Sequence, residues 1–282
     1  MQKAMFPALL LAGAILFTAG CKPDQPDTDT YAAVDNSLAE SAWQDIFAAV
    51  WQQAAANGFG GFTMGTGEER LMDDCPTVTF SETIGVYPNT MTIDFSGSCI
   101  GFLGAERAGK LIATFTGPYK DAGTVITITP VAYKLNGNKV QGTKTVTNTG
   151  MNADGHLVYD VQVTDGVITL VTGETITWNS SRTREWLEGQ DTDDILDDVY
   201  AISDGAAIDY AAEGVNRNGE HFVAHIVDPL IKRMDCRWIT QGIMEVTPDG
   251  YLTRSVDFGT GECDNHALVT IGDFAISVIL PI

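Results

Sequence analysis

Four cysteines are the side chains whose type and spacing most directly predict chemistry in this sequence. Two lie in residues 74–99 and two in residues 235–263. Both segments begin with Asp-Cys, turn at a proline near the middle and close with Asp-Phe shortly before the second cysteine. Four cysteines allow three disulfide connectivities. The repeat favours the one in which each segment closes its own hairpin with a disulfide. The favoured pairs are Cys75 with Cys99 and Cys236 with Cys263.

Zinc is the alternative chemistry for the second pair, because His266 follows Cys263 by three residues. Thiolate and imidazole groups are the ligands that structural zinc prefers. No Cys-x-x-Cys pair accompanies them. The disulfide is therefore the prediction, and no metal site is expected.

The segment "TITWNSSRTREWLEG" (175–189) combines two tryptophans with two arginines. Such a set can stack on sugars or bind a carboxylate. The structural alternative is that the tryptophans, an even number of residues apart, share a core face while the arginines pair with nearby acids. The candidate ligand contacts are Trp178, Arg182, Arg184 and Trp186.

Other motifs do not support catalysis or cofactor binding. "GAERAGKL" (104–111) lacks the Ser or Thr of a phosphate-binding loop and leads into a strand pattern. His221 and His225 lie about 13 Å apart on the expected strand, too far for one ion. The acidic segment 191–198 lacks the EF-hand glycine, and no Gly-x-Ser-x-Gly elbow occurs. We predict no catalytic residue and no cofactor, and the balance is against an enzyme.

The elements that must position these side chains are mostly strands. From Cys75 onward apolar and polar residues alternate, as in "HLVYDVQVTDG" (156–166), where every second residue from Leu157 to Val163 is apolar and shares one face. Dipeptides typical of tight turns recur, and they predict an antiparallel meander of about a dozen or more strands. They are Asn136-Gly137, Asp154-Gly155, Asp165-Gly166, Asn218-Gly219 and Asp249-Gly250.

One amphipathic helix is predicted near the N-terminus, at about residues 38–56. Ser37 and Glu40 have the spacing of a capping box, and Asn57-Gly58 supplies a left-handed end. The glycine-rich residues 58–67 are expected to connect helix and sheet. The predicted fold is all-β, a sandwich or an incomplete barrel of antiparallel strands with one N-terminal helix.

Residues 1–20 have the layout of a secretory signal, with Lys3 followed by an uncharged stretch shorter than a spanning helix. Thr18-Ala19-Gly20-Cys21 resembles the bacterial lipobox, in which the cysteine receives diacylglycerol. We expect a lipid-anchored Cys21 and a Pro- and Asp-rich tether over residues 21–34. Residues 35–282 form the single domain.

The net charge of −21 comes from 37 acidic and 16 basic residues. Nucleic acids require a clustered basic surface, which this sequence does not have. A nucleic-acid partner is therefore excluded, and the acidity indicates a soluble exported domain.

Several segments resemble uncharacterised envelope lipoproteins from Bacteroidota, over about residues 75–282. They include "YPNTMTIDF", "GKLIATFTGPYKDAGTVITIT", "NGNKVQGTKTVTNTG" and "DFGTGECDNHALVTI". The resemblance implies an envelope location and a β-rich fold. It implies no particular activity.

Together these observations predict an outer-membrane lipoprotein facing the periplasm or the cell surface. Its expected role is a binding or structural module that contacts the membrane through its lipid and engages a glycan, a peptide or an envelope protein. The alternative is a carrier for a lipid or another hydrophobic ligand, held in a cavity between sheet and helix and lined by Trp43 or Trp51.

Overall fold

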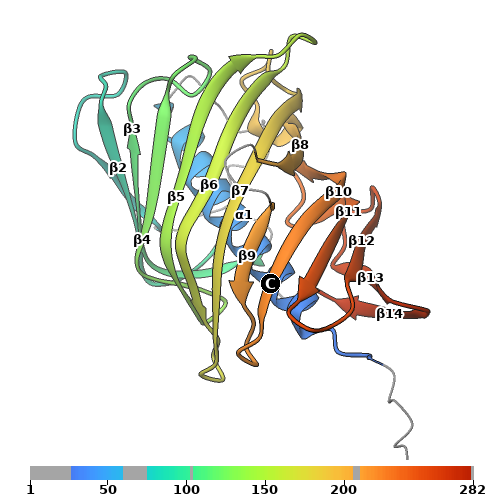
Figure 1. Ribbon diagram of the computed structural model, residues 1–282. Helices are drawn as coiled ribbons and strands as arrows, with labels where there is room; N and C mark the ends of the chain where they lie inside the picture. The colour runs from blue at the N-terminus through green and yellow to red at the C-terminus, as the bar shows by residue number, and fades with distance from the viewer. Residues whose placement is uncertain (1–26, 60–74, 102–103, 206–209, 281–282) are drawn as a thin grey trace, which may run out of the picture.

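The computed structural model describes residues 27–59, 75–101, 104–205 and 210–280. One antiparallel sheet curves around a single long helix, as Figure 1 shows. The helix is α1 (Tyr31–Ala56). The strands are β1 (Thr77–Phe80), β2 (Asn89–Ile100), β3 (Glu106–Phe115), β4 (Val125–Leu135), β5 (Asn138–Met151), β6 (Leu157–Thr169), β7 (Thr175–Glu188), β8 (Val199–Asp204), β9 (Ala212–Val215), β10 (His221–Arg233), β11 (Ile239–Pro248), β12 (Arg254–Thr260), β13 (His266–Ile271) and β14 (Phe274–Ile279).

The sheet is a meander in which strands that follow one another in the sequence pair. The exception is that β8 and β9 do not pair with each other, and each of them pairs with both β7 and β10. Strand β9 pairs with β7 at Thr177–Ser180, and β8 pairs with β7 at Arg182–Glu188. The two short strands therefore occupy the same place in the sheet, end to end. Because β1 and β14 end the strand order without pairing with each other, the sheet stays open. The arrangement is the predicted incomplete barrel rather than the sandwich.

Four of the five predicted turn dipeptides join consecutive strands. At the β4–β5 turn, Asn136 and Gly137 both have positive φ, as a tight hairpin requires. Asp165-Gly166 was predicted as a turn, and this is wrong, because β6 continues through it as a bulge that shifts the pairing with β7. Gly166 is needed there for close approach, since a Cβ would lie 2.3 Å from the Trp178 carbonyl oxygen.

The helix begins at Tyr31, earlier than the predicted start at residue 38, and ends at the predicted Asn57-Gly58. The expected capping box lies inside the helix, where the Ser37 hydroxyl donates to the Ala33 carbonyl oxygen at 2.8 Å. Burial against the sheet extends the helix beyond its local start signal. Tyr31–Val34, predicted as tether, are therefore helical. Most of the glycine-rich segment 58–67 lies outside the described residues.

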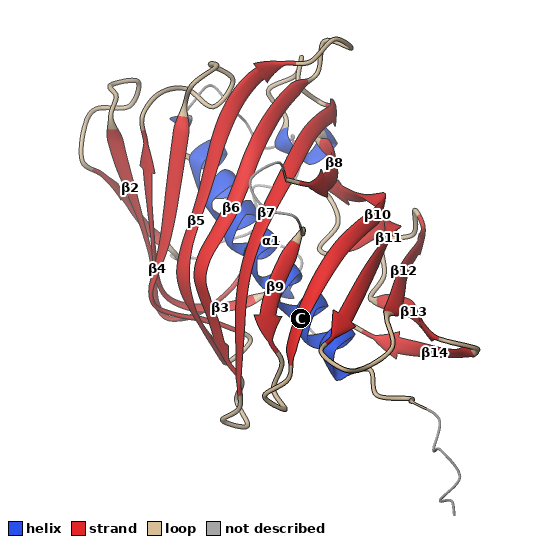
Figure 2. Ribbon diagram, in the orientation of Figure 1, coloured by secondary structure: helices blue, strands red, loops and turns tan. Residues whose placement is uncertain are grey.

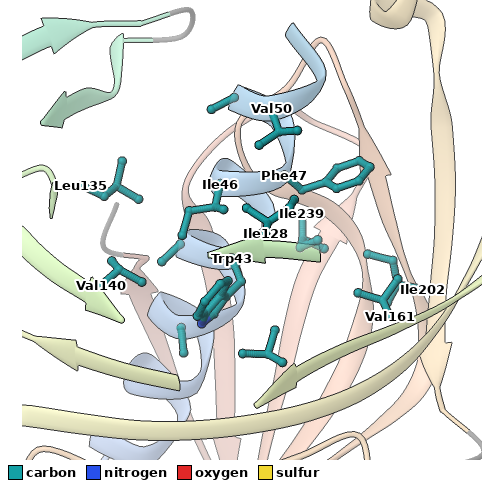
Figure 3. Close-up of a cluster of buried hydrophobic side chains, with 14 of the residues drawn as sticks. Trp43, Ile46, Phe47, Val50, Ile128, Leu135, Val140, Val161, Ile202 and Ile239 are labelled. Atoms are coloured by element: carbon teal, nitrogen blue, oxygen red, sulfur yellow. The ribbon is translucent and has the colours of Figure 1, made fainter. Parts of the chain in front are cut away.

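Helix α1 lies against the concave face of the sheet, where its side chains form the core (Figure 2). Figure 3 shows Trp43, Ile46, Phe47 and Val50 from the helix among inward-facing residues of the strands. The labelled strand residues are Ile128, Leu135, Val140, Val161, Ile202 and Ile239. No helix in the described part of the chain combines the length and apolar character that crossing a membrane requires.

Candidate functional site: a buried cationic cluster

The polar side chains of α1 are buried along with its apolar stripe. The predicted stripe faces the sheet, and Trp43 and Trp51 are each 1 % exposed. The curved sheet also covers the polar residues of the helix, which are Asp35, Asn36, Ser37, Glu40, Gln44, Asp45, Gln52 and Gln53. Buried polar groups cost free energy unless they are hydrogen-bonded. The inner face of the sheet must therefore supply partners.

Basic side chains at inward positions of the strands are those partners. Arg182 on β7 contacts Glu40 at 2.6 Å, with both side chains 3 % exposed. Arg107 on β3 holds the Asp45 carboxylate through two hydrogen bonds, of 2.9 and 2.7 Å. Each pair joins the helix to a strand far away in the sequence.

Two further cations lie over the same stretch of α1, and neither forms an ion pair with a carboxylate in the part of the chain that the structure describes. The Arg184 Nη2 donates to the Gln44 side-chain oxygen at 2.6 Å, and the Lys144 Nζ donates to the Trp43 carbonyl oxygen at 2.9 Å. The Phe47 ring lies beside both charges, 4.3 Å from the Arg184 guanidinium carbon and 5.4 Å from the Lys144 Nζ. An aromatic ring stabilises a cation only in part.

We call Lys144, Arg182, Arg184 and Glu40 the cationic cluster. Burial lowers the pKa of Lys144 well below its ordinary value, and the charge of Arg184 lowers it further. Burial raises the pKa of Glu40, but the charge of Arg182 and the hydrogen bonds from Gln44 and Arg182 outweigh it. That pKa therefore lies below its ordinary value. Glu40 is ionised, and it is the only carboxylate among the described residues that line the cavity of the cluster.

That cavity has a volume of about 10 Å³ and lies between α1 and strands β5 to β8. Its lining includes all four members of the cationic cluster together with Trp43, Gln44 and Trp178. A second cavity of about 10 Å³ follows along the helix and is lined by Asp45, Arg107 and Lys232 among others. A space of this size holds roughly one water-sized species.

All four predicted ligand-contact residues of β7 lie on the inner face of the sheet. Trp178, Arg182, Arg184 and Trp186 are between 0 and 3 % exposed. The Trp178 indole donates to the Asn36 side-chain oxygen at 2.9 Å, and Trp186 packs beside Tyr200 with ring centroids 5.5 Å apart. The structural alternative is confirmed for the shared core face of the two tryptophans and for Arg182, which pairs with an acid. It is wrong for Arg184, which donates to an amide oxygen.

Sequence reasoning did not identify Lys144, Glu40 or Gln44 as part of this group. Lys144 lies between Thr143 and Thr145, which are half-buried on the outer face, so alternation alone places it inward. A lysine at an inward-facing strand position was the feature of the sequence that could have indicated a buried charge. The Glu40 position was attributed to helix capping instead.

The structure confirms both predicted disulfides. Cys75 is bonded to Cys99 with Cα atoms 6.0 Å apart, and Cys236 to Cys263 with Cα atoms 5.7 Å apart. The second bond uses both cysteines that a zinc site would have required. Cys21 lies outside the described residues.

A larger, open cavity of about 230 Å³ lies at the end of the sheet, over β12, β13 and β14. Asp257, Glu262, Asp264 and His266 line it. They do not form a metal-binding set, and no group of three or more such ligands occurs elsewhere in the described ranges. The acidic segment around Asp193 is a loop with one 3₁₀ turn, Ile195–Asp197.

Fold and cluster together define an open antiparallel sheet filled by a helix, with a polar and positively charged interior. No protein-family model matches the chain, and no curated protein and no solved structure matches it either.

Proposed function

We propose that this protein is an outer-membrane lipoprotein, anchored through Cys21, that serves as a binding or structural module of the bacterial envelope. The observation that carries the proposal is the pair of disulfides, Cys75–Cys99 and Cys236–Cys263. Disulfides persist in oxidising compartments such as the periplasm and the cell surface. The lipobox-like residues before Cys21 and the resemblance to Bacteroidota lipoproteins point to the same compartment.

The start of the described chain is fixed to the domain, which supports a short tether. The Arg254 guanidinium donates to the Asp27 carboxylate at 2.9 Å and to the Asp29 carbonyl oxygen at 3.0 Å. Asp27 follows Cys21 by six residues, and an extended chain of that length spans at most about 20 Å. A lipid on Cys21 would hold this end of the domain close to the bilayer.

Two apolar side chains lie in the β11–β12 turn that leads into Arg254. Tyr251 is 50 % exposed and Leu252 is 55 % exposed. The Tyr251 ring lies 5.5 Å from the Arg254 guanidinium carbon, next to the fixed start of the chain. Aromatic and aliphatic side chains are favoured at a membrane interface. The turn therefore suits the membrane-facing end of the molecule.

The interior is better suited to stability than to carrying a ligand. The cavities beside α1 described above have volumes of about 10 Å³, whereas sites for small molecules occupy roughly 300–1,000 Å³. Trp43 and Trp51 pack into the core, and the cavity that Trp43 lines has only this small volume. The carrier alternative has no support from these residues, and a partner would bind on the outside of the sheet or its loops.

The outer face of the sheet offers a row of uncharged polar side chains. Directly paired positions on β2 to β6 place them side by side, and the Thr90 and Thr114 hydroxyls lie 3.4 Å apart. We call these residues the outer polar row: Thr90, Thr114, Thr127, Thr145 and Gln162. Hydroxyl and amide groups can donate and accept hydrogen bonds without charge. In so acidic a protein this row suits a neutral polar partner, and a glycan has that chemistry.

The anchor is tested by expressing the full chain in a Gram-negative host. We expect the mature N-terminus to begin at Cys21 and to carry diacylglycerol by mass spectrometry, with the protein in the outer-membrane fraction. The Cys21→Ser variant should lose the lipid and that location. Recovery of the wild-type chain in the cytosol with residues 1–20 intact would contradict the proposal.

The binding role is tested by retention on isolated cell-wall glycan. A double substitution in the outer polar row, Thr127→Lys with Thr145→Lys, should abolish retention. The matched control is Thr83→Lys with Thr172→Lys, two exposed threonines in turns, which should be retained like wild type. Equal retention of both double variants would exclude the row as the binding surface. Failure of the wild type to bind would contradict a glycan partner and leave a peptide or an envelope protein as the candidates.

A further inference from the structure

The cationic cluster carries more positive charge than its own residues balance. The cavity is lined by three basic side chains, Lys144, Arg182 and Arg184, and by one carboxylate, Glu40. Glu40 is engaged by Arg182 at 2.6 Å. With Lys144 protonated the excess is two positive charges (three basic minus one acidic). Burial lowers the pKa of Lys144, and with Lys144 neutral the excess is the single charge of Arg184. The place is shielded from water, where an unbalanced charge is expensive.

Hydrogen-bond donors in the cluster also exceed acceptors. The Arg182 Nε and the Arg184 Nε and Nη1 are buried and have no hydrogen-bond partner among the described residues. Arg184 is 1 % exposed, and the groups with which it forms hydrogen bonds, the Gln44 amide and the Tyr119 hydroxyl, are neutral. Buried donors normally have partners, and these belong to residues that line one cavity.

Other groups around the cavity do not supply the missing negative charge. From β6 and β8 it is lined by Val161, Val163 and Ile202, which are apolar. Asp198 contacts Tyr200 beside Arg184, with the Tyr200 hydroxyl 3.3 Å from a carboxylate oxygen. Burial raises the pKa of Asp198 to about 7, so this carboxyl is only partly ionised near neutral pH.

We propose that the cavity of the cationic cluster binds a single monatomic anion of the halide class, chloride under ordinary conditions. Lys144, Arg182 and Arg184 would supply the donors, and the ion would balance the charge of Arg184, which forms no ion pair among the described residues. The volume of about 10 Å³ suits a water-sized species and leaves no room for phosphate or a carboxylic acid. The ion would fix β5 and β7 onto α1, and this role does not depend on the lipid anchor or on an external partner.

The test is thermal unfolding of the mature protein in sodium chloride against sodium gluconate, at constant ionic strength and pH 7. A ligand that binds only the folded state raises the unfolding temperature with its concentration. A hundredfold rise in chloride above Kd should raise the midpoint by roughly 5 to 10 °C. Equal midpoints in the two salts at all chloride concentrations would overturn the proposal.

Variants separate this site from general salt effects. Lys144→Met and Arg184→Met should lose the chloride-dependent part of the midpoint, and Lys144→Gln serves if the methionine variant does not fold. Lys110→Met is the matched control, because Lys110 is half-exposed on β3 and pairs with Asp94 at 2.8 Å. It should respond to chloride like the wild type.

Crystals grown in sodium bromide give a second, independent readout. An anomalous difference peak between Lys144 and Arg184 would support the proposal. Density for water at that position, with no bromide signal, would overturn it whatever the unfolding data show.

Discussion

Asp45 in the middle of α1 and Arg107 on β3 form a bidentate ion pair, with Arg107 Nε 2.9 Å from Asp45 Oδ2 and Nη2 2.7 Å from Oδ1. Arg107 is 1 % exposed and Asp45 is 8 % exposed. The pair joins positions 62 residues apart, and it fixes the rotation of the helix inside the sheet. Such a pair affects stability chiefly because either charge, buried without its partner, would raise the free energy of the folded state.

Asp45→Ala should destabilise the protein strongly, since it leaves the Arg107 guanidinium buried without its carboxylate. We expect a loss of about 3–5 kcal/mol in the free energy of unfolding, measured by urea denaturation. The matched control is Asp94→Ala, which removes the partly exposed pair with Lys110 and should change stability little. A similar small change for both variants would show that the buried pair does not hold the helix.

Gly109→Ala should destabilise the β3–β4 pairing. Gly109 has φ +84°, and a Cβ there would lie 2.3 Å from the Ala132 carbonyl oxygen. Gly155→Ala is the control, because its φ of +85° is nearly the same but no atom lies within 4 Å of the added Cβ. The control should lose about 1–2 kcal/mol from backbone conformation alone. The Gly109 variant should lose clearly more, as the difference in urea midpoints will show.

Asp198 should make stability depend on pH. Burial raises the pKa of Asp198 to about 7 in the folded protein, against an ordinary value of 3.8. Between these values the folded state binds more protons than the unfolded chain, so this group's contribution is complete below about pH 4 and is lost as pH rises to about 7. The Asp198→Asn variant should lack this dependence.

The measurement for Asp198 is the free energy of unfolding of both proteins from pH 4 to pH 8. The stability of the variant relative to the wild type should increase from pH 4 to about pH 7 and stay constant above that. Parallel curves over the whole range would mean that Asp198 titrates normally in the folded protein.

Each disulfide should contribute to stability by restricting the unfolded chain. The Cys236→Ser, Cys263→Ser double variant removes a crosslink between residues 27 apart in sequence, and we expect it to lose about 3–4 kcal/mol on the chain-entropy estimate. Intact mass after alkylation gives the direct check. The four domain cysteines should be modified only after reduction, and four freely alkylated thiols in protein purified from the envelope would contradict both bonds.

Much of the fold could be predicted from the sequence because strand alternation reports a local environment. Leu157, Tyr159, Val161 and Val163 are buried on one face of β6, as the pattern predicted. Turn dipeptides are equally local, and four of the five occur where expected. Asp165-Gly166 failed because a positive φ followed by glycine also suits a bulge, and only the partner strand distinguishes the two.

The candidate site was much less predictable. Arg182 and Glu40 are 142 residues apart, and neither residue's neighbours indicate the other. The β7 residues were identified as a group, yet the choice between surface and interior depended on where α1 lies. The helix pattern predicted one buried stripe, and burial of the other faces follows from the curvature of the sheet.

Local sequence was enough to predict which residues of β6 face inward, where four of the hairpins turn and which cysteines pair, because these depend on neighbours along the chain or on one repeated hairpin. That the open sheet curves around the helix and brings Lys144, Arg182 and Arg184 together over Glu40 became clear only from the three-dimensional arrangement. The approach of these side chains depends on the curvature of the whole sheet and on the stagger of its strands. Each strand pairing contributes only a small part of that curvature.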